Sequence, residues 1–182
     1  MGMAAVTYYS AEMVRALPHD GNRYETVHGE LLVTPASRAG HQEIVGRIYV
    51  GLRAYTERIG VGHVFMSPAD ISWTEDTLVQ PDVFVVPLAE ARPLDWSGMR
   101  TLLLAIEVLS PSTARSDRFA KRRLYQEVGV PCYWIVDPDA RCVEVWTPQL
   151  TFPVVERAAV SWQPAGAGER FELQLAALFR PL

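Results

Sequence analysis

The amino-acid sequence predicts an α/β domain whose mixed β-sheet is flanked by helices. The apolar residues of segment 38–59 recur at helical spacing, which indicates a long amphipathic helix. Segments 78–86 and 102–109 are almost unbroken apolar runs, as is typical of strands buried on both faces. A second helical segment at 116–128 precedes a β-prone hairpin at 133–146, so helices and strands alternate around one sheet.

An N-terminal extension of one helix and one hairpin comes before the long helix. The short helix is predicted over 7–17, because a proline follows it directly, and either Thr7 or Ser10 supplies its N-cap. The hairpin is predicted over 23–34, where two β-prone runs surround a two-residue turn that ends in glycine. The long helix that follows ends at Gly60.

The rest of the chain supplies the sheet and one more helix. Strands are predicted at 61–66, 70–73, 78–86 and 102–109, with the polar, proline-containing segment 87–100 as a connection. Helix 116–128 begins at Ser116 or Asp117 as N-cap and ends before Gly129. Beyond the hairpin the signals weaken, and we expect strands near 152–156 and 158–162 and a helical turn near 175–179.

The chain is interpreted as a single domain of 182 residues, long enough to bury a full core. Its core covers about 38–147, between the extension at 7–34 and C-terminal strands and turn at 150–182. No apolar run approaches the roughly 20 residues of a membrane span. Segment 1–6 lacks the basic and apolar regions of a signal peptide, so we expect a cytoplasmic protein with no membrane partner.

Charge and cysteine content exclude several classes of protein. The formal net charge of −4 argues against a protein that coats nucleic acid through bulk electrostatics. It does not exclude an enzyme that cleaves phosphodiesters, because such an enzyme needs positive charge only locally. Cys132 and Cys142 form no CxxC pair and are expected as buried thiols, and the four histidines are scattered, so structural zinc is not expected.

Three residues form a candidate catalytic constellation: Asp82 and Glu107 in apolar strands, and Lys121 in the helix that follows. Lys121 is the only lysine among 17 basic residues, which indicates a need for a compact ammonium group at this position. Two carboxylates on adjacent strands can share Mg²⁺ or Mn²⁺, and a nearby lysine can orient a water or stabilise charge on a phosphoryl group. The alternative for Glu107 and Lys121 is a buried salt bridge without catalytic function.

Several segments resemble a known family. Pro81-Asp82 followed by Glu107-Val108-Leu109 is similar to the PD-(D/E)XK signature of restriction-endonuclease-like nucleases. The surrounding segments resemble those of the Uma-two family of that superfamily, a domain of unknown function, over about residues 7–150. These segments are Tyr24-Glu25, Gly29-Glu30-Leu31, His41, Gln80-Pro81-Asp82, Glu107 to Thr113, Asp117, Lys121, Tyr125, and Val130 to Asp137.

The resemblance implies a restriction-endonuclease-like fold and a metal-dependent nuclease. It implies that Asp82 and Glu107, with the carbonyl of Val108, bind Mg²⁺ or Mn²⁺. The signature places its lysine two residues after Glu107, where this chain has Leu109, so Lys121 takes that role. Nucleic acid is the implied partner, with DNA favoured, and the resemblance is compatible with a homodimer.

Other side chains receive supporting interpretations. Glu30 is favoured slightly over Glu25 as a third carboxylate, although either can be a surface charge of the hairpin. His41 is either a supporting group of the site or a helix-start residue bonded to a loop. Tyr125 lies one helical turn from Lys121, where it either positions the ammonium or packs in the core, and Asp117 is interpreted as a helix cap.

Three functional hypotheses follow. The first is a metal-dependent endonuclease that uses Asp82, Glu107 and Lys121. The second is a catalytically silent nucleic-acid-binding or regulatory module on the same fold, which the negative net charge favours somewhat. The third is a structural protein in which the same three residues form a buried ion network.

Overall fold

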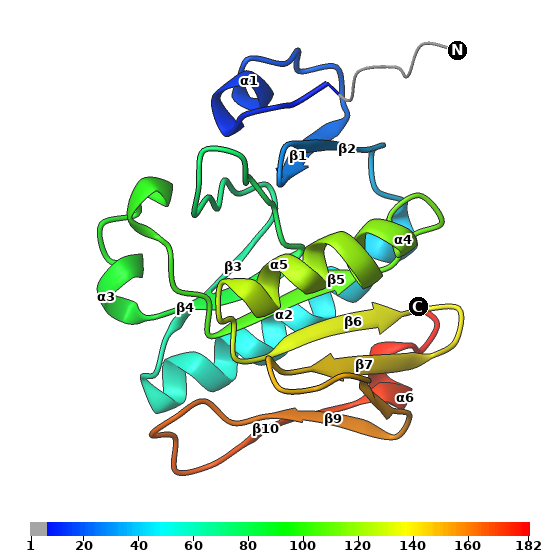
Figure 1. Ribbon diagram of the computed structural model, residues 1–182. Helices are drawn as coiled ribbons and strands as arrows, with labels where there is room; N and C mark the ends of the chain where they lie inside the picture. The colour runs from blue at the N-terminus through cyan, green and yellow to red at the C-terminus, as the bar shows by residue number, and fades with distance from the viewer. Residues whose placement is uncertain (1–6) are drawn as a thin grey trace.

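A six-stranded mixed sheet forms the centre of the molecule. The computed structural model describes residues 7–182 (Figure 1); segment 1–6, whose sequence lacks the features of a signal peptide, lies outside the described residues. The strand order is β3-β4-β5-β6-β7-β8, and only the β5–β6 pair is parallel. The strands are β3 (His63–Met66), β4 (Val83–Val86), β5 (Leu104–Val108), β6 (Tyr133–Asp137), β7 (Cys142–Trp146) and β8 (Val154–Glu156). The predicted mixed sheet flanked by helices is confirmed.

Helices cover both faces of this sheet, as Figure 1 shows. Helix α2 (Ala39–Ile59) packs on one face, and its Ile48 and Leu52 are fully buried because they repeat on one side of the helix. On the other face lies a continuous helical segment made of α4 (Ala114–Ser116), a π-helical turn (Asp117–Lys121) and α5 (Arg122–Glu127).

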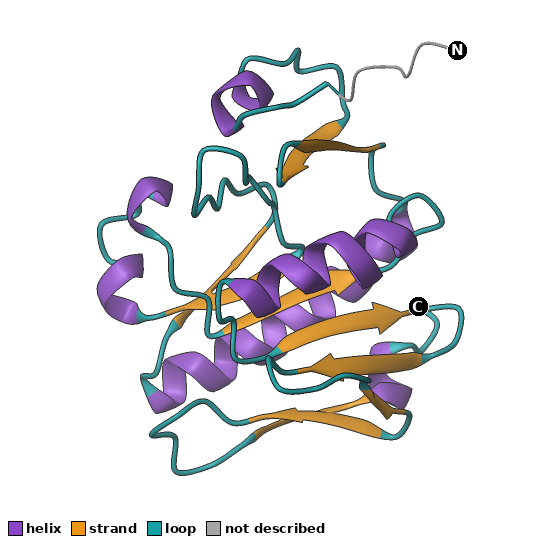
Figure 2. Ribbon diagram, viewed as in Figure 1, coloured by secondary structure: helices purple, strands orange, loops and turns teal. Residues whose placement is uncertain are grey.

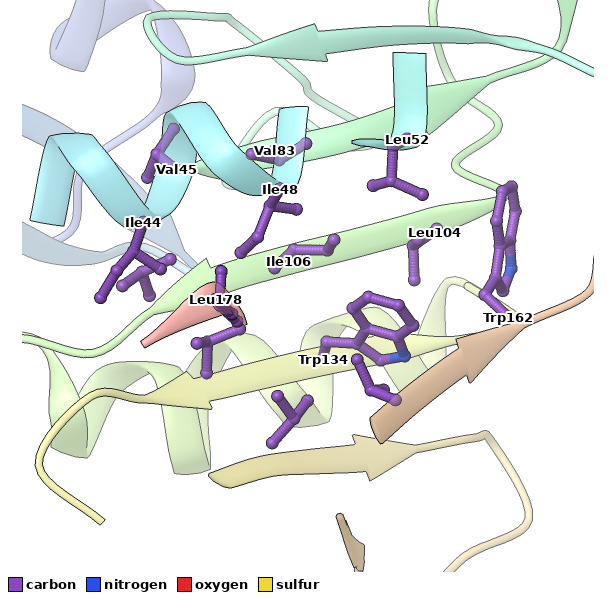
Figure 3. Close-up of a cluster of buried hydrophobic side chains, with 14 of the residues drawn as sticks. Ile44, Val45, Ile48, Leu52, Val83, Leu104, Ile106, Trp134, Trp162 and Leu178 are labelled. Carbon is purple, nitrogen blue, oxygen red and sulfur yellow. The ribbon is translucent and has the colours of Figure 1, made fainter. Parts of the chain in front are cut away.

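Side chains alternate in direction along the strands, so each face of the six-stranded sheet has its own hydrophobic core. Ile106 points toward α2 and packs with Trp134, as Figure 3 shows. Its neighbour Ala105 belongs to the opposite core, which contains Leu124 and Tyr125 of α5. Successive side chains of a strand point to opposite faces, so Glu107 lies on the α5 side. This register brings Glu107 close to the helical segment that carries Lys121.

The N-terminal extension forms a small unit beside the sheet (Figure 2). It consists of α1 (Ala11–Arg15) and the antiparallel pair β1 (Arg23–Val27) and β2 (Glu30–Thr34). Helix α1 is shorter than predicted, and Ser10 rather than Thr7 caps it, by accepting a hydrogen bond from the Met13 N–H. Backbone hydrogen bonds between Thr26 and Leu78 tie the hairpin to the main domain.

The C-terminal segment packs against α2. It contains the pair β9 (Ala159–Trp162) and β10 (Phe171–Gln174) and the turn α6 (Leu175–Leu178). Trp162 and Phe171 both contact the ring of Tyr55 on α2, which explains why this segment folds under the helix. Strand β10 is not among the predicted elements.

Three predicted segments differ from the structure. Segment 70–73 is not a strand and makes only an isolated bridge, between Ile71 and Val79. Strand β4 begins at Val83 instead of residue 78, because Pro81 has no N–H to donate to a sheet ladder. The connection 87–100 contains the turns α3 (Leu88–Ala91) and Trp96–Gly98.

Two expectations about the chemistry of the chain can be compared with the structure. Cys132 and Cys142 are free thiols; Cys142 is buried, as predicted, whereas Cys132 is only partly buried. Burial raises the pKa of the Cys132 thiol to about 12. Within residues 7–182, no helix combines the length and apolar character needed to span a bilayer.

Candidate active site

Four buried carboxylates meet near the C-terminal end of β5. Glu107 lies on β5, and Asp82 lies just before β4. Glu25 belongs to β1 and Asp117 to the π-helical turn. None of these four residues is more than 2% exposed. The antiparallel register of β4 and β5 aligns Val83 with Ile106 and so places Asp82 beside Glu107. This alignment lets the Val108 N–H donate to Asp82 Oδ2 at 2.8 Å.

Lys121 joins three of these carboxylates from the helical side. Its ammonium is 3.0 Å from Glu107 Oε1, 2.9 Å from Glu25 Oε2 and 3.4 Å from Asp117 Oδ1. Burial alone would lower the pKa of Lys121, but the charge of Glu107, with that of Glu25 and Asp117, holds it above its ordinary value. Lys121 is therefore a charged hydrogen-bond donor at neutral pH and does not serve as a base.

The π-helical turn determines the position of Asp117. Its wide turn interrupts the helical segment, which is the kind of irregularity often found at functional sites. The interpretation of Asp117 as a helix cap is wrong, since the segment begins earlier, with Thr113 at its N-cap position. Asp117 therefore lies inside the helical segment and faces the carboxylate cluster.

Asp82 is held by donors on both oxygens. Arg23 Nη1 donates to Oδ1 at 2.8 Å, and His41 Nε2 lies 3.1 Å from Oδ2. Burial alone would raise the pKa of Asp82, but the hydrogen bond from His41 and the charge of Arg23 hold it below its ordinary value. Asp82 is therefore ionised across the physiological pH range.

Glu107 has the opposite electrostatic environment. Tyr125 donates to its Oε1 at 3.2 Å, whereas Oε2 has no hydrogen-bond partner among residues 7–182. Burial raises the pKa of Glu107 well above its ordinary value; Lys121 opposes this shift, while the charge of Asp117 adds to it. A buried oxygen without a donor is costly, so Glu107 favours either a proton or a bound cation.

The donor chemistry of the cluster fits a divalent cation. Within residues 7–182, the four carboxylates contact two permanent cations, Arg23 and Lys121, which leaves excess negative charge in a buried environment. Carboxylate oxygens are the ligands that Mg²⁺ and Mn²⁺ prefer. In the described residues, however, no three His, Cys, Asp or Glu side chains already surround one metal position. The ligand set is suitable, but both oxygens of Asp82 and Oε1 of Glu107 already bond protein groups. Within residues 7–182, Oε2 of Glu107 has no such bond.

The predicted supporting residues separate into two groups. His41 and Tyr125 contact Asp82 and Glu107 directly, as described above. Glu30 is exposed and lines a different cavity, together with Arg115 and Arg123, so it is not part of the cluster.

Sequence reasoning missed Arg23 and gave too little weight to Glu25. Both lie on β1, where Glu25 is one of the four carboxylates and Arg23 bonds Asp82. The strand period of two places Arg23 and Glu25 on the same face as Val27, which is an apolar residue suited to the core. That pattern was the available signal for their burial.

Two cavities meet at the outer side of the cluster. One, of about 530 Å³, is lined by Arg23 and His41 with the β2–α2 loop and residues 109–113. The other, of about 760 Å³, also reaches Arg23 and extends along the N-terminal extension past Arg15. Only the smaller of these two cavities is lined by His41, which contacts Asp82, and by the residues that follow β5, so we regard it as the entrance to the site.

Comparisons with known proteins give the fold and the family of the chain. A crystal structure of "a putative nuclease belonging to DUF820" from Anabaena variabilis is similar in fold, with a TM-score of 0.77 and 20% sequence identity. The match covers 94% of this chain and 97% of that chain. A search of curated proteins finds no significant match. The profile of the Uma2 family, described as "Putative restriction endonuclease", matches residues 11–176, and the chain belongs to this family.

Proposed function

We propose that the protein is a metal-dependent nuclease that hydrolyses phosphodiester bonds of nucleic acid, with DNA as the first substrate to test. The observation that carries this proposal is the buried Lys121 among carboxylates, with Oε2 of Glu107 left without a hydrogen-bond donor among residues 7–182. Membership of a family described as "Putative restriction endonuclease" supports the same reaction class. Such a constellation resembles the PD-(D/E)XK site, with the lysine supplied by the helix.

In this proposal Asp82, Glu107 and the carbonyl of Val108 would hold Mg²⁺ or Mn²⁺. When bound, the cation lowers the pKa of a coordinated water and neutralises charge on the phosphoryl group. Lys121 holds the Glu107 carboxylate in position through its 3.0 Å hydrogen bond. Its ammonium group also stabilises negative charge on the phosphoryl group. His41 orients Asp82, and Tyr125 orients Glu107.

The substrate approaches through the cavity of about 530 Å³ that Arg23 and His41 line. Arg38 and the hydroxyl of Ser112 also line this cavity and can donate to phosphate oxygens. This local set of donors explains how a chain with a net charge of −4 can bind a polyanion.

A gel assay tests the proposal. Supercoiled plasmid, single-stranded DNA and RNA are incubated with wild type, Glu107→Gln or Asp82→Asn in Mg²⁺ or Mn²⁺, with EDTA as a further control. We expect cleavage by the wild type only, and only with metal. Both variants retain side-chain shape, and circular dichroism checks their folding. Equal cleavage by either variant would overturn the mechanism.

A second candidate is a nucleic-acid-binding or regulatory module without catalysis. The observation that favours it is that both Asp82 oxygens are already bonded to protein donors. In that case the wild type would retard labelled DNA in a gel-shift assay. It would cleave none of the three substrates with either metal.

A further inference from the structure

Arg23 occupies an unusual position between the buried cluster and the two cavities. Its side chain is only 16% exposed, and Nη1 bonds Asp82 Oδ1, the Gln80 carbonyl and the Ser67 hydroxyl. Its Nε lies 3.8 Å from Glu25 Oε2. Arg23 is therefore a cation placed among the same carboxylates to which a metal would bind.

The three donors on Asp82 differ in how easily they can leave. The Val108 N–H belongs to a strand backbone and is fixed, and His41 bonds Oδ2 as well. Oδ1 is held by Arg23. Because an arginine side chain has several rotatable bonds, it can release Oδ1 without a change in the fold, whereas the strand cannot release Oδ2.

Space for the released guanidinium exists on both sides. Arg23 lines both the 530 Å³ and the 760 Å³ cavities, and the loop 34–37 borders each of them. A guanidinium binds phosphate oxygens through two parallel hydrogen bonds. An arginine that leaves Asp82 would therefore present its charge to the substrate backbone in the entrance cavity.

We propose that Arg23 competes with the divalent cation for the Asp82 carboxylate and acts as a positioning residue that closes the site until the cation displaces it. This inference rests on the proposed metal-dependent function. It assigns Arg23 two partners: Asp82 before the cation binds and a phosphate group afterwards.

Titration calorimetry with Mn²⁺ tests this exchange in the full-length protein. Arg23→Gln removes the competitor, and Arg15→Gln is the matched control, because Arg15 pairs with Asp70 in the larger cavity and its loss changes the net charge equally. We expect Arg23→Gln to bind Mn²⁺ about tenfold more tightly than the wild type, and Arg15→Gln to bind within about twofold of it.

The outcomes separate the inference from the proposed function. Equal or weaker Mn²⁺ binding by Arg23→Gln, beside measurable binding by the wild type, would overturn the competition and leave the metal site in place. Absence of Mn²⁺ binding in all three proteins would overturn the proposed function itself. If Arg23→Gln unfolds without metal, Mn²⁺ should restore its native circular dichroism spectrum; failure to restore it would also refute the competition.

Discussion

The ammonium of Lys121 donates to Oε1 of Glu107 at 3.0 Å from a position 14 residues further along the chain. A strand and a helix on the same face of the sheet create this contact, and Glu25 and Asp117 enclose it. The ion pair is fully buried, so replacing one of its members should change the free energy of unfolding. This change can be measured separately from activity.

Replacement of the ammonium by an apolar group should unfold the site. Lys121→Met leaves buried carboxylates without a cation, and we expect the free energy of unfolding to fall by about 4 kcal/mol. Adding Glu107→Gln to Lys121→Met removes one of the uncompensated charges and should recover part of the loss. Urea denaturation of the four proteins of this cycle measures the coupling. A fully stable Lys121→Met protein with no coupling would contradict the electrostatic description.

The hydroxyl of Tyr125 should affect both stability and catalysis. Tyr125→Phe removes the hydrogen bond to Glu107 while it keeps the ring packed, and we expect a loss of about 1.5 kcal/mol. The cleavage rate should fall as well, because Glu107 loses one of the groups that orient it. Denaturation and the plasmid assay measure the two effects. Unchanged values in both would mean that Tyr125 serves only in packing.

Acid should weaken the ion pair between Arg118 and Asp137. Burial alone would raise the pKa of Asp137, but hydrogen bonds from the Ala140 N–H and Arg118 hold it below its ordinary value. This carboxylate therefore adds stability above its ordinary pKa, and the contribution is lost as pH falls through the lower folded-state pKa.

Asp137→Asn tests this pH dependence. We expect it to cost about 1 kcal/mol near neutral pH, a small value because Arg118 is partly exposed and screened by solvent. The difference from the wild type should shrink below pH of about 4. Denaturation curves across this range measure it, and a difference that grows in acid would show that the sign is wrong.

The packing of α2 should depend on the buried side of the helix. Ile48 is fully buried in the core that Figure 3 shows, and Ile48→Ala should destabilise the protein by about 3 kcal/mol through lost burial and a cavity. Val50 on the same helix is 67% exposed, so Val50→Ala should change stability by less than about 0.5 kcal/mol. Equal losses of stability in the two variants, measured by thermal denaturation, would mean that α2 turns a different side toward the core.

The contact between Glu107 and Lys121 could be predicted because it follows from local patterns. An apolar run indicates a buried strand, a helical segment follows it, and the connection between them is short, so the two side chains must lie at the same end. The single lysine of the sequence is the residue that makes this contact.

The contributions of Arg23 and Glu25 could not be predicted with the same certainty. They depend on how the N-terminal hairpin docks on the main domain, through bridges such as Thr26 with Leu78, and local periodicity contains no information on docking. Asp117 was misassigned because several hydroxyl and carboxylate residues in 110–117 are good caps, and the sequence does not show which one the helix uses.

The burial of Lys121 also gives the chain a chemical reporter of its own unfolding. Amine-reactive reagents modify lysine side chains and the terminal amine, and this chain has one lysine whose ammonium is enclosed by carboxylates. In the folded protein that amine is inaccessible, at 1% exposure. The rate at which a second label appears on each molecule would therefore follow the opening of this one site, without any engineered probe.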